Sequence, residues 1–358
     1  MRLLYFQPIN QYSWGYISML KRLFPVIIAV LILIGVGCFF SPYKSVSVLE
    51  QLPAPTHVEV ADLLAVTDLW NEQERLLIAI SADGSVEEIY VPSSIIFTFS
   101  TGTLVKIGGT RDFSTGIISA RTLEVINGAN IIVSSPKSGA VITSPLIVFG
   151  FSRTFEAAVN WRIKDLSGNI LDEGYDMSAA QDIGQFGPFR LEIFLPVIAE
   201  KDFILEVFEY SMKDGSDLSL ISLPLVLLNT ETTDFDIYFT NNTKVTNNCR
   251  QLYPVSRKIA LTSAVGRAAV LDLLKGPTTE EKKLGYRTAI PESTSLLSLA
   301  VGEKQTWVNF NSLILSGWSG TCRAETIRAQ IAQTLVQFPY IGDVILSVDG
   351  NVEKKLTP

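Results

Sequence analysis

The most regular pattern of hydrophobic and polar positions lies between residues 235 and 350. Strand patterns occur at Phe235 to Phe239, in a hairpin with arms Ser295 to Val301 and Thr306 to Phe310, and at Asp343 to Val348. A helix is predicted from Ala264 to Lys275, ended by Gly276-Pro277. A second helix follows from apolar residues at helical spacing: Ala324, Ile327, Ile331, Leu335 and Phe338. The order predicts an α+β domain, β-α-β-β-α-β, over residues 235–352.

Residues 130–229 show a different pattern, in which short apolar runs are separated by turn signals such as Asp214-Gly215. The predicted strands are Ile131 to Ser134, Leu146 to Phe151, Ala157 to Lys164, Asn169 to Tyr175, Pro188 to Phe194, Phe203 to Tyr210 and Ile221 to Leu228. This spacing predicts an immunoglobulin-like β-sandwich. Its expected core anchors are Trp161, Phe189, Phe203 and Phe208.

Residues 58–129 begin with a weakly amphipathic stretch, Val58 to Glu74. Short strand patterns follow at Arg75 to Ser81, Val86 to Val91, Thr103 to Ile107 and Gly116 to Ile126. They predict a small all-β domain, barrel-like and similar to an OB-fold. Ligand-binding OB faces need aromatic and basic side chains, which are sparse here, so the domain is interpreted as a spacer.

An uncharged apolar run from Leu23 to Phe40 approaches the roughly 20 residues needed to cross a bilayer. Lys21 and Arg22 precede it, and the positive-inside rule places residues 1–22 in the cytoplasm and the rest of the chain outside. Residues 41–57, rich in proline and polar side chains, are interpreted as a linker. The chain is therefore predicted to be a multidomain protein of mixed class behind one transmembrane helix.

Two alternatives to a retained anchor remain open. If translation starts at Met19, the apolar run follows a short basic region, as in a cleaved secretory signal. Ile34 to Cys38 resembles a bacterial lipobox, in which Cys38 would be lipidated and become the mature N-terminus. All of these readings place the remaining chain on the outer side of the membrane.

Composition narrows the function classes. The chain has 358 residues, of which 47% are hydrophobic, and a formal net charge of -7 without a basic stripe, which argues against nucleic-acid binding. The single histidine, His57, lies in the predicted linker, which leaves little for a hydrolase triad or a histidine metal site. The acidic group Asp165, Asp172, Glu173, Asp176 and Asp182 lacks the spacing of a calcium loop. We expect no enzyme activity, no cofactor and no metal site.

Several separated motifs of the C-terminal domain resemble one known family. They are Cys249 with Leu252 to Arg257, Leu273 to Glu281, Ile290 to Thr294, and Cys322 to Ile331. These stretches resemble the GerMN domain, a family named after a bacterial sporulation and spore-germination lipoprotein. The resemblance implies an envelope-facing module similar in form to ring-building domains of secretion-like assemblies, with no established catalytic residues.

The predicted sandwich carries a second resemblance, in Ser135-Pro136, Ser144-Pro145-Leu146, Gly187-Pro188-Phe189 and Glu209-Tyr210-Ser211. These motifs are similar to the immunoglobulin-like domain of bacterial spore germination, a family frequently found beside GerMN domains. The resemblance implies an extracytoplasmic interaction module without catalytic residues.

Cys249 and Cys322 lie at positions that match the GerMN family, each just before an element of the same domain. Outside the membrane this pair is expected to form a disulfide, with two buried thiols as the alternative. The candidate glycan or partner contacts are Trp318, Arg257 and Arg323; Trp307, within a strand, is expected in the core.

The function expected from these features is a membrane-anchored extracytoplasmic interaction protein of the bacterial envelope that binds itself or envelope proteins. The alternative is a module that binds peptidoglycan or another surface glycan, and a cell-wall hydrolase is the remote one.

Overall fold

The computed structural model describes residues 56–244, 248–316 and 321–352. No helix within these residues is long and apolar enough to span a membrane. The predicted membrane segment at residues 23–40, with Cys38, and the alternative start at Met19 lie outside the described residues.

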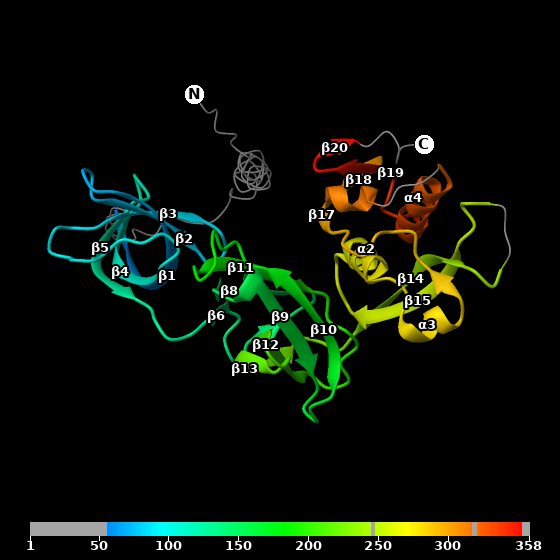
Figure 1. Cartoon of the computed structure of the whole chain (residues 1–358), viewed down its shortest axis with the longest axis horizontal. Helices are drawn as coiled ribbons and strands as arrows, with labels where there is room; N and C mark the ends of the chain where they lie inside the picture. The colour runs from blue at the N-terminus through cyan, green and yellow to red at the C-terminus, as the bar shows by residue number, and fades with distance from the viewer. Residues whose placement is uncertain (1–55, 245–247, 317–320, 353–358) are drawn as a thin grey trace, which may run out of the picture. The chain divides into compact units, whose positions relative to one another are not determined.

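The first described domain is a closed β-barrel in which neighbouring strands follow the order β1-β2-β3-β5-β4. Its strands are β1 (His57–Asn71), β2 (Leu76–Ser81), β3 (Val86–Tyr90), β4 (Leu104–Asp112) and β5 (Ile118–Val125). Strand β3 runs parallel to β5, whereas β1 pairs antiparallel with both β2 and β4 (Figure 1). The predicted small barrel is thereby confirmed.

Strand β1 corrects the sequence interpretation, which read Val58 to Glu74 as weakly amphipathic and ended the linker at residue 57. The strand already begins at His57 and spans 15 residues. Its register shifts between Val60 and Leu63, where Asp62 has a φ of 58°, and again between Thr67 and Leu69. Each irregularity breaks the two-residue alternation on which strand recognition depends.

Aliphatic side chains fill the barrel, among them Leu77, Ile89 and Ile107, all fully buried. Gly109 allows strands β4 and β5 to approach closely, because a Cβ at this position would lie 2.2 Å from the Ser119 carbonyl oxygen. The glycine sits where the β4–β5 register shifts, so it is part of the closure of the barrel.

The second domain is a sandwich of two sheets, with strand orders β10-β9-β12-β13-β7 and β11-β8-β6. Its strands are β6 (Ile131–Ser135), β7 (Val141–Ile142), β8 (Leu146–Ser152), β9 (Ala158–Lys164), β10 (Ile170–Met177), β11 (Gly187–Ile193), β12 (Asp202–Tyr210) and β13 (Asp217–Leu227). The predicted strands are confirmed, and β7 is a short addition that pairs parallel to β13.

The core of the sandwich contains Phe189 and Phe203, as expected, while Trp161 packs against it partly buried. Phe208 is buried but lies outside this cluster. It is covered instead by the Arg162 guanidinium, 4.3 Å from the ring centroid, and by Tyr210 in an edge-on contact. Phe208 therefore stabilises the outer surface of the sheet and is not an anchor between the sheets.

The third domain combines two sheets with helices. Its elements are β14 (Thr232–Asn241), β15 (Tyr253–Ala260), α2 (Val265–Lys275), α3 (Thr279–Lys283), β16 (Tyr286–Arg287), β17 (Leu296–Val301), β18 (Gln305–Phe310), α4 (Thr321–Val336), β19 (Asp343–Val348) and β20 (Asn351–Val352). Strands β15-β14-β16 form one sheet, and β17-β18-β19-β20 form the other, in which β18 and β19 are parallel.

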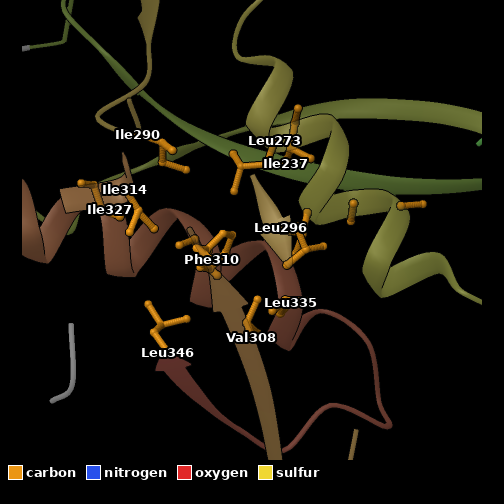
Figure 2. Packing of buried hydrophobic residues seen from close by; sticks show 14 of the residues in the cluster. Ile237, Leu273, Ile290, Leu296, Val308, Phe310, Ile314, Ile327, Leu335 and Leu346 are labelled. Atoms are coloured by element: carbon orange, nitrogen blue, oxygen red, sulfur yellow. The ribbon is translucent and has the colours of Figure 1, made fainter. Parts of the chain in front are cut away.

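The predicted β-α-β-β-α-β order is thus incomplete, because Tyr253 to Arg257 was read as a connection. It is the first part of β15, which pairs with β14 along its length. Helix α3 was also missed, although Thr278 and Glu281 form a capping box at its start. Both predicted helices are present, and they cover one face of the β17–β20 sheet around Val308, Phe310 and Leu346 (Figure 2).

Helix α4 also covers the edge of β14 that β15 leaves open. Gln330 Nε2 donates to the Tyr238 carbonyl (3.0 Å), and the Tyr238 amide donates to Thr334 Oγ1 (3.3 Å). Gln337 follows directly after the last residue of α4. The amide of Asp236 donates to Gln337 Oε1 (2.8 Å), and Gln337 Nε2 donates to the Asp236 carbonyl (2.6 Å). These side chains take the place of a neighbouring strand, so this edge of β14 is closed to further pairing.

The sandwich and the third domain are joined by polar contacts. The Arg267 guanidinium binds Glu192, with Nη2 2.9 Å from Oε2, and Lys275 Nζ lies 3.0 Å from Asp172 Oδ2. Burial raises the pKa of Glu192, but the hydrogen bonds and charge of Arg267 outweigh it and hold the pKa below its usual value. The Ala260 amide donates to the Leu195 carbonyl (3.0 Å), which adds a backbone link.

Candidate functional site

An exposed tryptophan marks the outer face of the β17–β20 sheet. Trp307, in the middle of β18, is 42% exposed, whereas its strand neighbours Thr306 and Val308 are fully buried. Successive side chains of a strand face opposite sides of the sheet, so Trp307 points away from the helices. The expectation that Trp307 belongs to the core was therefore wrong. The signal was present in the sequence, because Val308 and Phe310 differ by two positions and only one parity can face the core.

The turn before β18 positions the indole ring. The Gly302 amide donates to the Gln305 carbonyl (2.9 Å) and closes the β17–β18 hairpin. A Cβ at Gly302 would lie 3.0 Å from Trp307 Cζ3, so the ring rests against the turn where a side chain would crowd it. The absence of a side chain at Gly302 thus leaves the space that the Trp307 ring occupies beside the turn.

Neighbouring strands extend this surface. Trp307 pairs with Ala300 on one side and Ile345 on the other, and the next row consists of Ser298, Asn309, Ser347 and Val352. We call these residues together the Trp307 face.

Asn309 stiffens the Trp307 face. Its Oδ1 accepts hydrogen bonds from the Gly350 amide (2.9 Å) and from Ser347 Oγ (3.1 Å). The named residues carry no formal charge, and Val352 at the sheet edge is exposed. Ser347 is buried beneath this row, whereas Ser298, Ala300 and Trp307 are exposed. An exposed tryptophan among uncharged side chains is typical of a protein contact site.

Arg257, expected as a partner contact, is instead consumed by ion pairs inside the domain. Its Nε donates to Asp272 Oδ2 (2.7 Å), and Nη1 and Nη2 donate to the two carboxylate oxygens of Glu281 (2.6 and 2.9 Å). Burial lowers the pKa of Arg257, but the hydrogen bond and charge of Glu281 with those of Asp272 outweigh it and leave the pKa raised. A side chain held in this way joins β15 to α2 and α3, and its role as a partner contact stays a prediction.

The predicted disulfide between Cys249 and Cys322 is present, with Cα atoms 5.4 Å apart. Thr326 Oγ1 donates to the Cys249 carbonyl (2.8 Å), which fixes the same junction by a second link. Arg323, one residue after Cys322, donates from Nε to the Ala289 carbonyl (3.2 Å). Trp318 lies outside the described residues.

The histidine and the acidic residues singled out in the sequence lie in separate interactions. His57 Nδ1 lies 3.6 Å from Asp112 Oδ2, an exposed pair at the barrel surface. Asp165 accepts from the Asn169 amide (2.8 Å), whereas Asp172 is paired with Lys275. Burial raises the pKa of Asp176 without bringing a second carboxylate to it. No group of three or more metal-ligating side chains occurs in this part of the chain.

The fold is that of a β-rich multidomain protein with an immunoglobulin-like domain. Residues 130–216 match the family described as "Immunoglobulin-like domain of bacterial spore germination". Residues 236–354 match the family described as "Sporulation and spore germination". The chain therefore carries one domain of each spore-germination family, and neither description names an enzyme.

Solved structures similar to the chain include a putative lipoprotein from Clostridium perfringens, at 23% identity and a TM-score of 0.24, covering 35% of this chain and 80% of the other. The tandem GerMN domains of the sporulation protein GerM from Bacillus subtilis show 16% identity and a TM-score of 0.28, covering 35% of this chain and 42% of theirs. The first GerMN domain of that protein shows 17% identity and a TM-score of 0.25, covering 34% and 86%. No curated protein matches the chain.

Proposed function

We propose that this protein is a membrane-anchored interaction protein of the bacterial cell envelope, and that the Trp307 face is where its C-terminal domain contacts a protein partner. The partner is another envelope protein or a further copy of the chain. The observation that carries the proposal is a tryptophan, 42% exposed, whose cross-strand neighbours Ala300 and Ile345 are uncharged. Tryptophan is among the residues that contribute most to binding when they are buried at the centre of an interface.

The location outside the membrane is supported by two independent features. The apolar run Leu23 to Phe40 follows Lys21 and Arg22, the charge order that directs the C-terminal part outward. The Cys249–Cys322 disulfide belongs to an oxidising compartment. Both family descriptions concern spore germination, which supports a role at the cell envelope.

The test is photo-crosslinking in intact cells. A photoreactive amino acid replaces Trp307, and the captured proteins are identified by mass spectrometry. The matched control places the same amino acid at Tyr340, which is 48% exposed and stacks on Phe338.

We expect a discrete crosslinked band from position 307 and none from position 340. Mass spectrometry of the band distinguishes an envelope protein from a second copy. Equal crosslinking from both positions, or none from either, would contradict the proposed contact face.

A further inference from the structure

The barrel carries a surface hollow that neither matched family covers, because the matches begin at residue 130. The hollow has a volume of about 430 Å³ and lies where two turns meet the ends of β2, β3 and β5. It is lined by Glu74, Leu76, Tyr90, Asp112, Thr115, Ile117 and Ser119. The volume falls within the range that small ligands occupy.

An aromatic ring forms its floor. Leu76 pairs with Tyr90 in the β2–β3 ladder, and Tyr90 pairs with Ser119 in the β3–β5 ladder, so the three residues form one row across the strands. Tyr90 is 43% exposed, whereas Ile89 beside it is fully buried in the barrel. The Tyr90 ring therefore faces solvent with an aliphatic side chain on one flank and a hydroxyl on the other.

Hydrogen-bonding groups form the rim. Asp112 Oδ1 is occupied within its own turn by the amides of Ser114 (2.8 Å) and Thr115 (3.0 Å). The other carboxylate oxygen, Asp112 Oδ2, lies 3.6 Å from His57 Nδ1. Thr115, Ser119 and Glu74, all exposed, complete the rim. Thr115 Oγ1 accepts from the Ile117 amide (3.2 Å), and Glu74 Oε2 accepts from Asn71 Nδ2 (2.9 Å).

The two arginines beside the hollow are held by hydrogen bonds to other groups of the barrel. Arg75 donates from Nε to the Val91 carbonyl (2.6 Å) and from Nη2 to the Pro92 carbonyl (3.1 Å). Arg111 binds Glu87 (2.7 Å) and the Gly116 carbonyl (3.2 Å). The residues that line the hollow include two carboxylates, Glu74 and Asp112, and no lysine or arginine, so the lining disfavours nucleic acid and other polyanions.

From this geometry we infer that the hollow is a binding site for a short uncharged oligosaccharide. A pyranose ring offers an apolar face that packs on an aromatic ring, and a border of hydroxyls that hydrogen-bond to carboxylates and hydroxyls. Tyr90 supplies the first feature, and Glu74, Thr115 and Ser119 supply the second. The site is separate from the Trp307 face and does not depend on a protein partner there.

The test is isothermal titration calorimetry of the full-length protein with oligomers of N-acetylglucosamine as the uncharged probe. Tyr90→Ala is expected to weaken binding by about tenfold or more, because the aromatic ring on which the sugar stacks is lost. The matched control, Tyr175→Ala, removes a tyrosine that is 70% exposed in the sandwich, and it should leave affinity unchanged. Ser119→Phe fills the hollow without removing the Tyr90 ring and should abolish binding.

Oligolysine and poly-glutamate serve as charged probes. The inference is overturned if the wild type binds none of the sugars at millimolar concentration, or if Tyr90→Ala and Ser119→Phe both bind as tightly as the wild type. Binding of oligolysine that depends on Tyr90, without sugar binding, would overturn it in favour of a basic peptide. None of these outcomes bears on crosslinking from position 307, so the two proposals fail independently.

Discussion

At the scale of single residues, the role of a side chain depends more on the groups that the fold places beside it than on its residue type. Arg257 is a basic residue in a motif that resembles a family, and its sequence neighbours do not show that Asp272 and Glu281 will surround it. In the folded domain its donors are occupied by both carboxylates. Trp307 is the opposite case, because this large apolar side chain was expected in the core and is exposed in the folded domain.

The Arg257–Glu281 pair leads to a prediction about pH. Glu281→Gln keeps a residue that can complete the capping box but loses the charge that Arg257 binds, so we expect a loss of about 1–3 kcal/mol in unfolding free energy at neutral pH. Burial raises the pKa of Glu281, yet Arg257 and the Thr278 amide outweigh it and hold the folded-state pKa below 4.5. The contribution is therefore fully present above this value and is lost as pH falls through the folded-state pKa.

The measurement is hydrogen exchange of the C-terminal domain in urea at neutral pH and at about pH 3, where a carboxyl group of ordinary pKa is mostly protonated. The difference between Glu281→Gln and the wild type should shrink on acidification. Glu280→Gln, at the exposed neighbouring position, is the control and should change little at either pH. A difference that stays constant would contradict the ion-pair explanation.

At the scale of elements, helix α4 does more than cover a sheet with apolar side chains. Its face toward β14 carries Gln330 and Thr334, and Gln337 follows directly after its last residue, Val336. All three side chains bind the backbone of the strand. The pattern of Ala324, Ile327, Ile331 and Leu335 was enough to predict the helix. The sequence could not show that the adjacent glutamines complete a strand edge, because that edge is exposed only after β14 has paired with β15.

Gln330 tests this role. It is fully buried, and besides the Tyr238 carbonyl it binds the Ala289 amide (2.9 Å). Gln330→Leu is expected to lower the unfolding free energy by about 2–4 kcal/mol, because two buried backbone groups lose their partners. The control Gln333→Leu lies on the same helix, where the side chain makes an exposed bond to the Arg250 carbonyl.

The control variant should lower the unfolding free energy by less than about 1 kcal/mol, as substitutions at exposed positions commonly do. Urea unfolding followed through hydrogen exchange of β14 measures both variants. Equal stability of the two variants would show that the glutamine side chain is not needed at the strand edge.

At the scale of the whole molecule, the described chain combines a barrel, a sandwich and an α+β domain, and the disulfide is the covalent link within the last of these. Cys249 and Cys322 are separated by 73 positions in the sequence. The bridge connects the loop before β15 to α4. These segments are also joined by the Thr326 hydrogen bond and by contacts of Arg250 with Glu325 and Gln333. Loss of the disulfide should therefore lower the stability of the domain that carries the Trp307 face.

The double variant Cys249→Ser/Cys322→Ser is expected to lower the stability of the C-terminal domain by about 2–4 kcal/mol, since a loop of this length is no longer closed in the unfolded chain. Thermal unfolding with and without a reducing agent provides the measurement. Reduction should lower the Tm of the wild type and leave the variant unchanged. A wild type insensitive to reduction would show that the bridge does not contribute.

The sequence by itself determined the class and order of the parts: the strands of the sandwich, both long helices of the third domain and the presence of a small barrel. Local periodicity and turn residues carry that information, because they are fixed by neighbours within a few positions. Tertiary structure alone decided that β1 and β15 are strands, since one is interrupted by bulges and the other contains Pro254 and Arg257. It also decided that Gln330 completes a strand edge and that the Tyr90 hollow exists, because those depend on contacts between segments far apart in the chain.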